Sequence, residues 1–267
     1  MLRRTRFMTF IGALLASVSL SAAAQFAPDC TAIHDANPAA GDGQYLISPG
    51  GKTFSVYCHD MAGTPREYLT LVNTGGGRNY SAYGQLSSPP GNVITQYTRI
   101  RLDPMTLLVD ISDQTFATST GFQCCIGPTP VTSMPYANAA SCIGWDDGHA
   151  NVDLAGTSFK VRDTFTLEGW FPYGSINGSY MYWGETRLVD GQTFSLTGGG
   201  SCGGLGPNPG GDINTNGGFA LQLEFLGGVT VGKDTCKSGG WHAFGVFRNQ
   251  GDCVSYFATQ GRNGPAL

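Results

Sequence analysis

The sequence predicts a mainly β fold: an antiparallel, sandwich-like, disulfide-linked domain with long glycine-rich loops. Three observations support this class. Forty glycines and 14 prolines interrupt the chain at short intervals. Only 13% of the residues are charged, which leaves few side chains for the polar faces of surface helices. Short apolar and β-branched runs recur between turn residues, and no helical period of useful length is present.

The expected strands succeed one another along the chain. Several alternate apolar with polar residues, as half-buried strands do, and 219–225 is the clearest example. The expected strands are 44–48, 53–58, 68–72, 98–102, 107–111, 151–154, 159–162, 165–167, 194–196, 219–225, 241–248 and 253–259. The glycine-rich stretch 198–218 is expected to be an exposed, mobile loop that Cys202 ties to the core.

Residues 1–24 have the composition of a cleavable signal peptide. Three arginines in the first six residues precede an apolar run at 7–20, and three alanines then allow cleavage before Gln25. The run is shorter than the about 20 apolar residues of a membrane-spanning helix. We therefore expect a secreted protein, extracellular or periplasmic, with no membrane span and a single domain at 25–267.

The charge of the remaining chain excludes some partner classes. Loss of the segment removes three arginines, which leaves 12 basic against 19 acidic residues and a net charge of −7. Nucleic acids and anionic membranes are bound through cationic contacts, so neither is an expected partner. A cation, a neutral glycan or a basic protein is compatible with this charge.

The cysteines indicate a disulfide framework. All of them follow the proposed cleavage site, their number is even, and no C-x-x-C pair of the kind found in metal sites occurs. Neighbours in sequence are strained when joined to each other, so Cys124 and Cys125 are expected to pair elsewhere. The eight are Cys30, Cys58, Cys124, Cys125, Cys142, Cys202, Cys236 and Cys253.

Three segments near the start carry a family resemblance. CTAI at 30–33, GQYLI at 43–47 and FSVYCHDM at 54–61 resemble the opening of a GON domain, the carboxy-terminal domain of ADAMTS-type extracellular metalloproteases. The similarity is clearest over 30–225, which leaves 226–267 as a C-terminal extension. The same opening is more distantly similar to fibrinogen-like recognition domains, and both resemblances imply a Cys30–Cys58 disulfide.

The other six cysteines allow 15 pairings. GON domains usually carry more cysteines around the CGG segment at 202–204, so the resemblance assigns no pairing there. Cys236–Cys253 is favoured because both lie in the last segment, near predicted facing strands.

The sequence offers no catalytic motif. None of the histidines (His34, His59, His149 and His242) begins the H-E-x-x-H pattern of zinc proteases, and no G-x-S-x-G elbow occurs. The metallopeptidase activity associated with the GON family is therefore not supported by this chain, and we expect a protein that is not an enzyme.

One segment resembles half of a calcium loop. Asp212, Asn214 and Asn216 follow the D-x-N-x-N-G pattern, in which alternate oxygens surround one ion, but Leu223 stands where the bidentate glutamate belongs. The alternative is an Asn/Gly-rich turn before a strand. Calcium is thus the one cofactor the sequence suggests, and its binding would be weak.

A second cluster suggests a ligand site. Trp145, Asp146, Asp147 and His149 combine an aromatic face, two carboxylates and an imidazole, as a sugar or cation site does. The alternative is ordinary packing of aromatic residues in a β domain. Asn79 and Asn177 begin N-x-S sequons, which accept glycans only in a host that glycosylates secreted proteins.

Together these features predict a secreted, non-catalytic recognition module of the GON type that binds an extracellular protein or glycan. Two alternatives remain: a calcium-dependent, fibrinogen-like lectin module, and a metallopeptidase-associated secreted protein that binds zinc or calcium.

Overall fold

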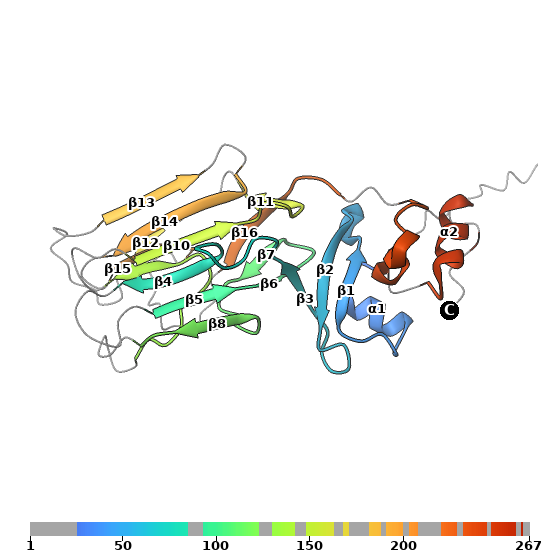
Figure 1. Ribbon diagram of the computed structural model, residues 1–267, viewed down its shortest axis with the longest axis horizontal. Coiled ribbons are helices and arrows are strands. Elements are labelled where there is room, and N and C mark those ends of the chain that lie inside the picture. The colour runs from blue at the N-terminus through green and yellow to red at the C-terminus, as the bar shows by residue number, and fades with distance from the viewer. Residues whose placement is uncertain are drawn as a thin grey trace, which may run out of the picture.

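The computed structural model confirms a mainly β fold (Figure 1). It describes residues 26–84, 93–122, 130–141, 148–162, 168–170, 182–187, 191–199, 203–207, 220–228, 232–244, 247–259 and 263. The proposed signal peptide lies outside the described residues.

The first sheet has seven strands, each antiparallel to its neighbours. Their spatial order is β1-β2-β3-β6-β7-β16-β11, so the first three strands are consecutive in sequence and the last two come from distant segments. The bounds are β1 Gly43–Ile47, β2 Phe54–His59, β3 Arg66–Thr70, β6 Arg99–Leu102, β7 Leu108–Asp110, β16 Ala220–Phe225 and β11 Phe159–Val161.

The second sheet has nine strands in the order β12-β15-β9-β4-β10-β14-β13, and β5 joins both β4 and β8. All pairs are antiparallel except β4 with β9. The bounds are β4 Tyr80–Gly84, β5 Val93–Tyr97, β8 Ala117–Thr120, β9 Ala139–Ser141, β10 Gly148–Asp153, β12 Glu168–Trp170, β13 Tyr182–Arg187, β14 Thr193–Gly199 and β15 Gly203–Gly206.

The main apolar core draws on both sheets. Phe54 and Val56 of the first sheet belong to the same buried cluster as Val152 and Phe194 of the second. β2 shows how the sequence produces this arrangement, because its residues alternate between buried and half-buried along the strand. One face of the strand therefore points into the core and the other away from it.

Two predicted strands are wrong. Residues 241–248 and 253–259 fall mainly in a 3-10 helix, η2 (Lys237–Phe244), and in an α-helix, α2 (Gln250–Ala258). Asn249 caps α2 by accepting a hydrogen bond from the backbone of Asp252. Cys253 and Tyr256 are both buried at helical spacing on α2. Short apolar runs are compatible with either a strand or a helix, and Asn249 was not recognised in the sequence as the N-cap residue of a helix.

The predicted loop at 198–218 is also wrong in part. β14 continues to Gly199, and Gly203–Gly206 form β15 between β9 and β12. A β-carbon on Gly206 would lie 2.3 Å from the side-chain oxygen of Asn138, so the close approach requires glycine. Glycine here indicates tight packing rather than a loop. Two further helices were not predicted: α1 (Cys30–Ala36) and η1 (Pro49–Gly51).

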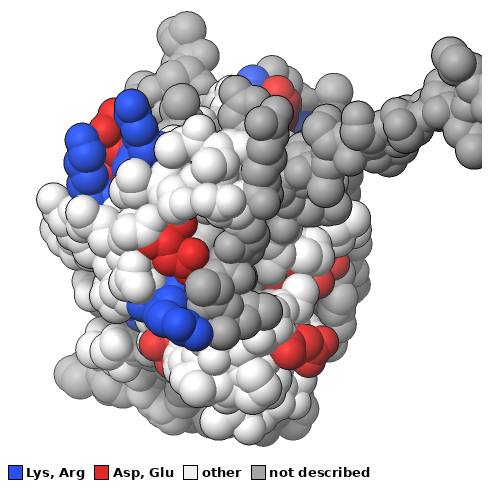
Figure 2. Space-filling view, turned by 90° about the vertical axis from the view of Figure 1, so that its right-hand side faces the viewer, with Lys and Arg blue, Asp and Glu red and all other residues white. Residues whose placement is uncertain are grey.

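The C-terminal residues form a small helical unit, here called the cap, made of 232–244 and 247–259. A disulfide joins Cys236, the residue before η2, to Cys253 of α2, and both are buried with Phe244, Phe247 and Tyr256. Leu46 of β1 belongs to the same cluster, so the cap packs on the first sheet. Figure 2, which views this end of the molecule, shows the charged side chains of the described residues in small separate groups of both signs.

A buried polar network lies where the chain passes from β3 of the first sheet to β4 of the second. The side chain of Asn79, just before β4, donates to the carbonyl oxygens of Asn73 (2.6 Å) and Asp153 (2.8 Å). It accepts from the Tyr136 hydroxyl (2.6 Å) and from the Asp153 backbone (2.9 Å). Its φ of 49° lies in the left-handed region, where asparagine is among the few tolerated residues. Because this side chain is fully buried, the folded protein has no room for a glycan on the Asn79 sequon.

Replacing both Cys236 and Cys253 by serine is expected to cost about 3 kcal/mol of unfolding free energy on the chain-entropy model. The cap should then separate from Leu46 and expose apolar surface. Chemical denaturation together with a dye that binds apolar surface measures both effects. An unchanged unfolding free energy and unchanged dye binding would show that the disulfide does not hold the cap.

Asn79→Ala is expected to cost about 3 kcal/mol or more, because it leaves several buried partners without a hydrogen bond. Gln96→Ala, on the neighbouring strand β5 and exposed, is the control and should change stability by less than about 0.5 kcal/mol. Urea unfolding of both variants tests this, and equal stabilities would contradict the structural role of the network.

Candidate functional site

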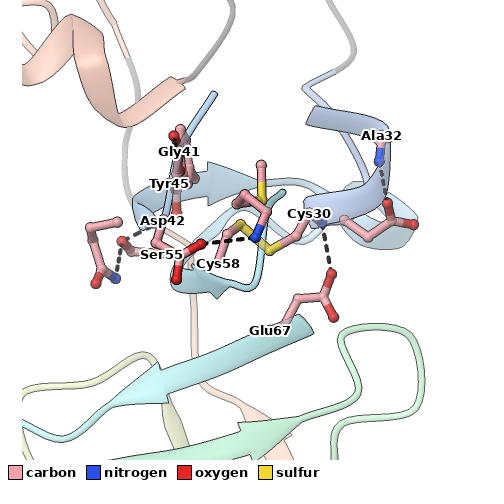
Figure 3. Close-up of a disulfide and its surroundings, with 11 residues drawn as sticks. Cys30, Ala32, Gly41, Asp42, Tyr45, Ser55, Cys58 and Glu67 are labelled. Carbon is pink, nitrogen blue, oxygen red and sulfur yellow. Dashed lines mark hydrogen bonds between the residues drawn. A yellow bond between two sulfur atoms is a disulfide. The ribbon is translucent and has the colours of Figure 1, made fainter. Parts of the chain in front are cut away.

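A disulfide fixes the start of the fold. Cys30, the first residue of α1, is joined to Cys58 of β2, the pair that the family resemblance implies (Figure 3). The backbone N–H of Cys30 donates to Glu67 of β3 (2.7 Å), and Asp29 caps α1 by accepting from Ala32 (2.7 Å). Both carboxylates lie at the positive end of a helix, where negative charge is favourable. α1 is thereby held on the core side of β2 and β3.

Glu67 is held in a largely buried position at the helix start. Burial raises the pKa of its carboxyl group, and the nearby carboxylates of Asp29 and Asp103 act in the same direction. The hydrogen bond from Cys30 opposes the shift without cancelling it. Ionised Glu67 therefore carries a cost of desolvation that the helix start only partly offsets.

A second carboxylate closes the turn after β2. Asp42 accepts a hydrogen bond from the Met61 backbone (2.8 Å) and is hydrogen-bonded to Nδ1 of His59 (2.8 Å). Burial raises the pKa of Asp42, but the hydrogen bonds from Met61, Asp60 and His59 outweigh it and the net shift is downward. Asp60 takes a positive φ of 56° in this turn and accepts from Thr64. The His59–Asp60 segment is thus part of a closed turn.

The outward-facing side chains of the first sheet form the feature that we call the outer-face patch. Cross-strand pairing places Gln44, Tyr57, Tyr68, Arg101 and Asp110 in one row across five strands. Its members are Gln44, Ser55, Tyr57, His59, Tyr68, Thr70, Arg99, Arg101 and Phe116. Together they bring aromatic, cationic and hydroxyl groups to one surface.

Phe116, which immediately precedes β8, organises the aromatic part of the patch. Its ring meets Tyr68 edge-to-face, with centroids 4.8 Å apart, and makes similar contacts with His59 (5.1 Å) and Tyr57 (5.5 Å). Edge-to-face pairs at these distances are attractive. The rings therefore hold one another in place on the sheet.

Arg99 stacks on this aromatic group. Its guanidinium carbon lies 4.0 Å from the ring centre of Tyr57 and 4.8 Å from that of Phe116. Its Nε donates to the hydroxyl of Thr70 (3.3 Å), which donates to Gln44 (3.1 Å). Gln44 in turn donates to Ser55 (2.8 Å). A hydrogen-bond chain across four strands thus fixes the rotation of the guanidinium.

Arg101 differs from Arg99 because it is neutralised. Its Nη1 lies 3.5 Å from the carboxylate of Asp110 and 3.8 Å from that of Asp113. Asp113 also accepts from the Tyr68 hydroxyl (3.0 Å). Burial raises the pKa of Tyr68, so this hydroxyl stays protonated as a donor. Of the two arginines on the patch, Arg99 is the one with no carboxylate partner among the described residues.

Most of the sequence-predicted ligand residues lie outside the described residues. These are Trp145, Asp146 and Asp147, the calcium candidates Asp212, Asn214 and Asn216, and the cysteines Cys124, Cys125, Cys142 and Cys202. His149 is described: it lies exposed on β10, with Nδ1 3.5 Å from the hydroxyl of Thr197. The second described disulfide is Cys236–Cys253, the favoured pair, but it joins the turn before η2 to α2 rather than two facing strands.

Sequence reasoning missed the outer-face patch. The signal was the alternation of β2, which sends Tyr57 and His59 to the face opposite Cys58. Arg99 and Phe116 could not be added to it, because their positions depend on which strand follows β3 in the sheet. Within the described ranges, no cluster of three or more histidine, cysteine, aspartate or glutamate residues could hold a metal ion. No described helix is long and apolar enough to cross a membrane.

Glu67→Gln tests the helix start. The raised pKa means that Glu67 contributes stability below its ordinary value of 4.5 and that this contribution is lost as the pH rises through the folded-state value. Glutamine keeps an acceptor for Cys30 but does not titrate. The melting temperature of the variant relative to wild type should therefore rise between about pH 4 and pH 7. A difference in melting temperature that does not change with pH would contradict the desolvation cost of ionised Glu67.

Comparison with known proteins places the chain in a family. The model of the GON domain matches residues 27–92 and 85–216. Human "A disintegrin and metalloproteinase with thrombospondin motifs 20" is 29% identical over 199 residues, which cover 65% of this chain and 10% of that protein. "A disintegrin and metalloproteinase with thrombospondin motifs gon-1" of Caenorhabditis elegans is 26% identical over 162 residues, or 52% of this chain and 7% of that protein.

The chain therefore spans a tenth or less of the length of these relatives. No solved structure matches it. The described sheets, α1 and the Cys30–Cys58 bond fall within the matched region except for β16, whereas the whole cap lies beyond residue 216. On the extent of the family match, this chain belongs to the GON-domain family.

Proposed function

We propose that this protein is a secreted, non-catalytic GON-type module that binds an extracellular protein or glycan through the outer-face patch. The observation that carries the proposal is the Arg99 guanidinium, stacked on Tyr57 and Phe116 and held by Thr70. Aromatic and arginine side chains with fixed geometry lose little entropy on binding, and such residues supply most of the energy at recognition surfaces.

The contacts of His59 support binding over catalysis. In the described part of the chain, His59 contacts the carboxylate of Asp42 and the rings of Tyr68 and Phe116. No hydroxyl or thiol is within hydrogen-bond reach of it there, as nucleophilic catalysis requires. An Asp–His pair without a nucleophile is suited to holding a surface loop in place.

Two disulfides support an extracellular location. Cys30–Cys58 and Cys236–Cys253 are both buried, and such bonds form and persist in oxidising compartments. The predicted signal peptide would deliver the chain to one.

The alternatives rest on weaker observations. A calcium-dependent lectin would use Asp212, Asn214 and Asn216, whose geometry lies outside the described residues. A role beside a metalloproteinase, with zinc or calcium bound, rests on the names of the two relatives, and the matched region is a small part of each.

Removing Tyr57 tests the proposed surface. The protein should bind at least one member of a panel of purified extracellular matrix proteins and glycans, and Tyr57→Ala should weaken that binding at least tenfold by removing the platform under Arg99. Tyr80→Ala, on β4 of the other sheet and similarly half-buried, is the matched control. Biolayer interferometry measures both. Equal affinities of the two variants, or no binding to any panel member, would contradict the proposal.

A further inference from the structure

The terminal nitrogens of Arg99 are hydrogen-bond donors of the outer-face patch that no described residue uses. Stacking on Tyr57 fixes the plane of the guanidinium, and Nε is occupied by Thr70. The two terminal nitrogens have no acceptor among the described residues. A planar guanidinium with its rotation fixed and its terminal N–H groups free matches a carboxylate, which accepts two parallel hydrogen bonds from it.

We propose that Arg99 binds the carboxylate of an acidic sugar, and that this is the ligand class of the surface described above. The inference rests on the proposed function of that surface. The carboxylate would accept from both terminal nitrogens of Arg99, while the sugar ring would lie over the neighbouring aromatic and hydroxyl groups.

Charge on the patch favours a ligand with one anionic group. Arg101 is neutralised by Asp110 and Asp113, and His59 is paired with Asp42. Arg99 is therefore the one open cation of the patch and lies among three carboxylates, whereas the exposed Arg66, opposite His59 on the same face, lies at the other end of β3 from Thr70 and Arg99. A densely sulfated polymer or a run of acidic side chains would meet these carboxylates and be repelled. A single carboxylate avoids them.

The neighbours of Arg99 favour a sugar over a peptide. Thr70, Gln44 and Ser55 form a line of hydroxyl and amide groups, in which Gln44 has a second N–H to donate and the oxygens have lone pairs to accept from sugar hydroxyls. The half-buried ring of Tyr57 offers an apolar edge for the C–H face of a pyranose. Leu46, two residues from Gln44 and on the same side of β1, is covered by the cap, which bounds the surface at that end.

Two carboxylated sugars distinguish the possible sources of the group. Sialyllactose carries it on a sialic acid, and a hyaluronan hexasaccharide carries it on a uronic acid. Lactose and the carboxyl-reduced hexasaccharide are the neutral analogues. A heparin hexasaccharide and a glutamate-rich peptide supply the sulfated and the protein alternatives. All six probes are titrated against the full protein by calorimetry at physiological salt.

At least one carboxylated sugar is expected to bind, and its neutral analogue at least tenfold more weakly. Arg99→Ala should abolish most of this affinity, and Arg99→Lys should lose about tenfold because it keeps the charge but not the paired donors. Arg162→Ala removes an exposed arginine at the opposite edge of the sheet and should change affinity by less than about twofold. Melting temperatures verify that each variant is folded.

Several outcomes would overturn the inference. Equal binding of the neutral analogue, or equal binding by Arg99→Ala, removes the carboxylate contact. Arg99-dependent binding of the peptide or of heparin in place of the carboxylated sugars assigns the site to a protein or to a sulfated polymer. The inference is also rejected if neither carboxylated sugar binds. The proposed function is contradicted by a different result, namely that Tyr57→Ala leaves binding to the panel unchanged. If a neutral panel member binds in a way that depends on Tyr57 but not on Arg99, the proposed function holds and only the acidic-sugar inference is rejected.

Discussion

The Cys30–Cys58 disulfide determines which side of the first sheet faces outward. It joins α1 to β2 on the core side, and the alternation of the strand then sends Tyr57 and His59 to the other face. A shift of one residue in the register of β2 would bury these two and expose Phe54 and Val56. The bond is internal, yet it determines the chemistry of the surface on the far side of the strand.

The outer-face patch depends on contacts from distant parts of the chain. β3 and β6 are neighbours in the sheet and Thr70 pairs with Arg99, although 28 residues lie between these two in the sequence. Between them the chain enters the second sheet through the Asn79 network and returns along β5. Phe116 then arrives just before β8 and covers Tyr68. The buried network at the crossing to the second sheet thus lies on the path of the chain between the residues that form the patch.

The two ends of the first sheet's outer face differ in whether they belong to the region that matches the family model. The patch lies within the region that matches the GON family, and the cap that covers Leu46 lies beyond it. The cap is held by its own disulfide and its own cluster of aromatic residues. The cap, which lies outside the matched region, therefore covers one end of the outer face of a sheet that lies mostly within that region.

Much of the fold could be predicted from the sequence, and the exceptions have physical reasons. The alternating strands β2 and β16 were predicted because each has one buried face. The residues around Cys253 were assigned to a strand because a nine-residue helix is too short to show a clear period. β15 was assigned to a loop because its glycines indicate flexibility in sequence but close packing in the structure. The patch was not predictable, since it depends on strand order.

Recognition by the outer-face patch requires that Arg99 is held rigidly before any ligand arrives. Nitrogen-15 relaxation of the arginine Nε–H groups measures this in the free protein, with the exposed Arg162 as an internal reference. The structure predicts a restrained Arg99 Nε whose proton is shifted by the ring currents of Tyr57 and Phe116. An Arg99 side chain as mobile as that of Arg162, with no ring-current shift, would contradict it.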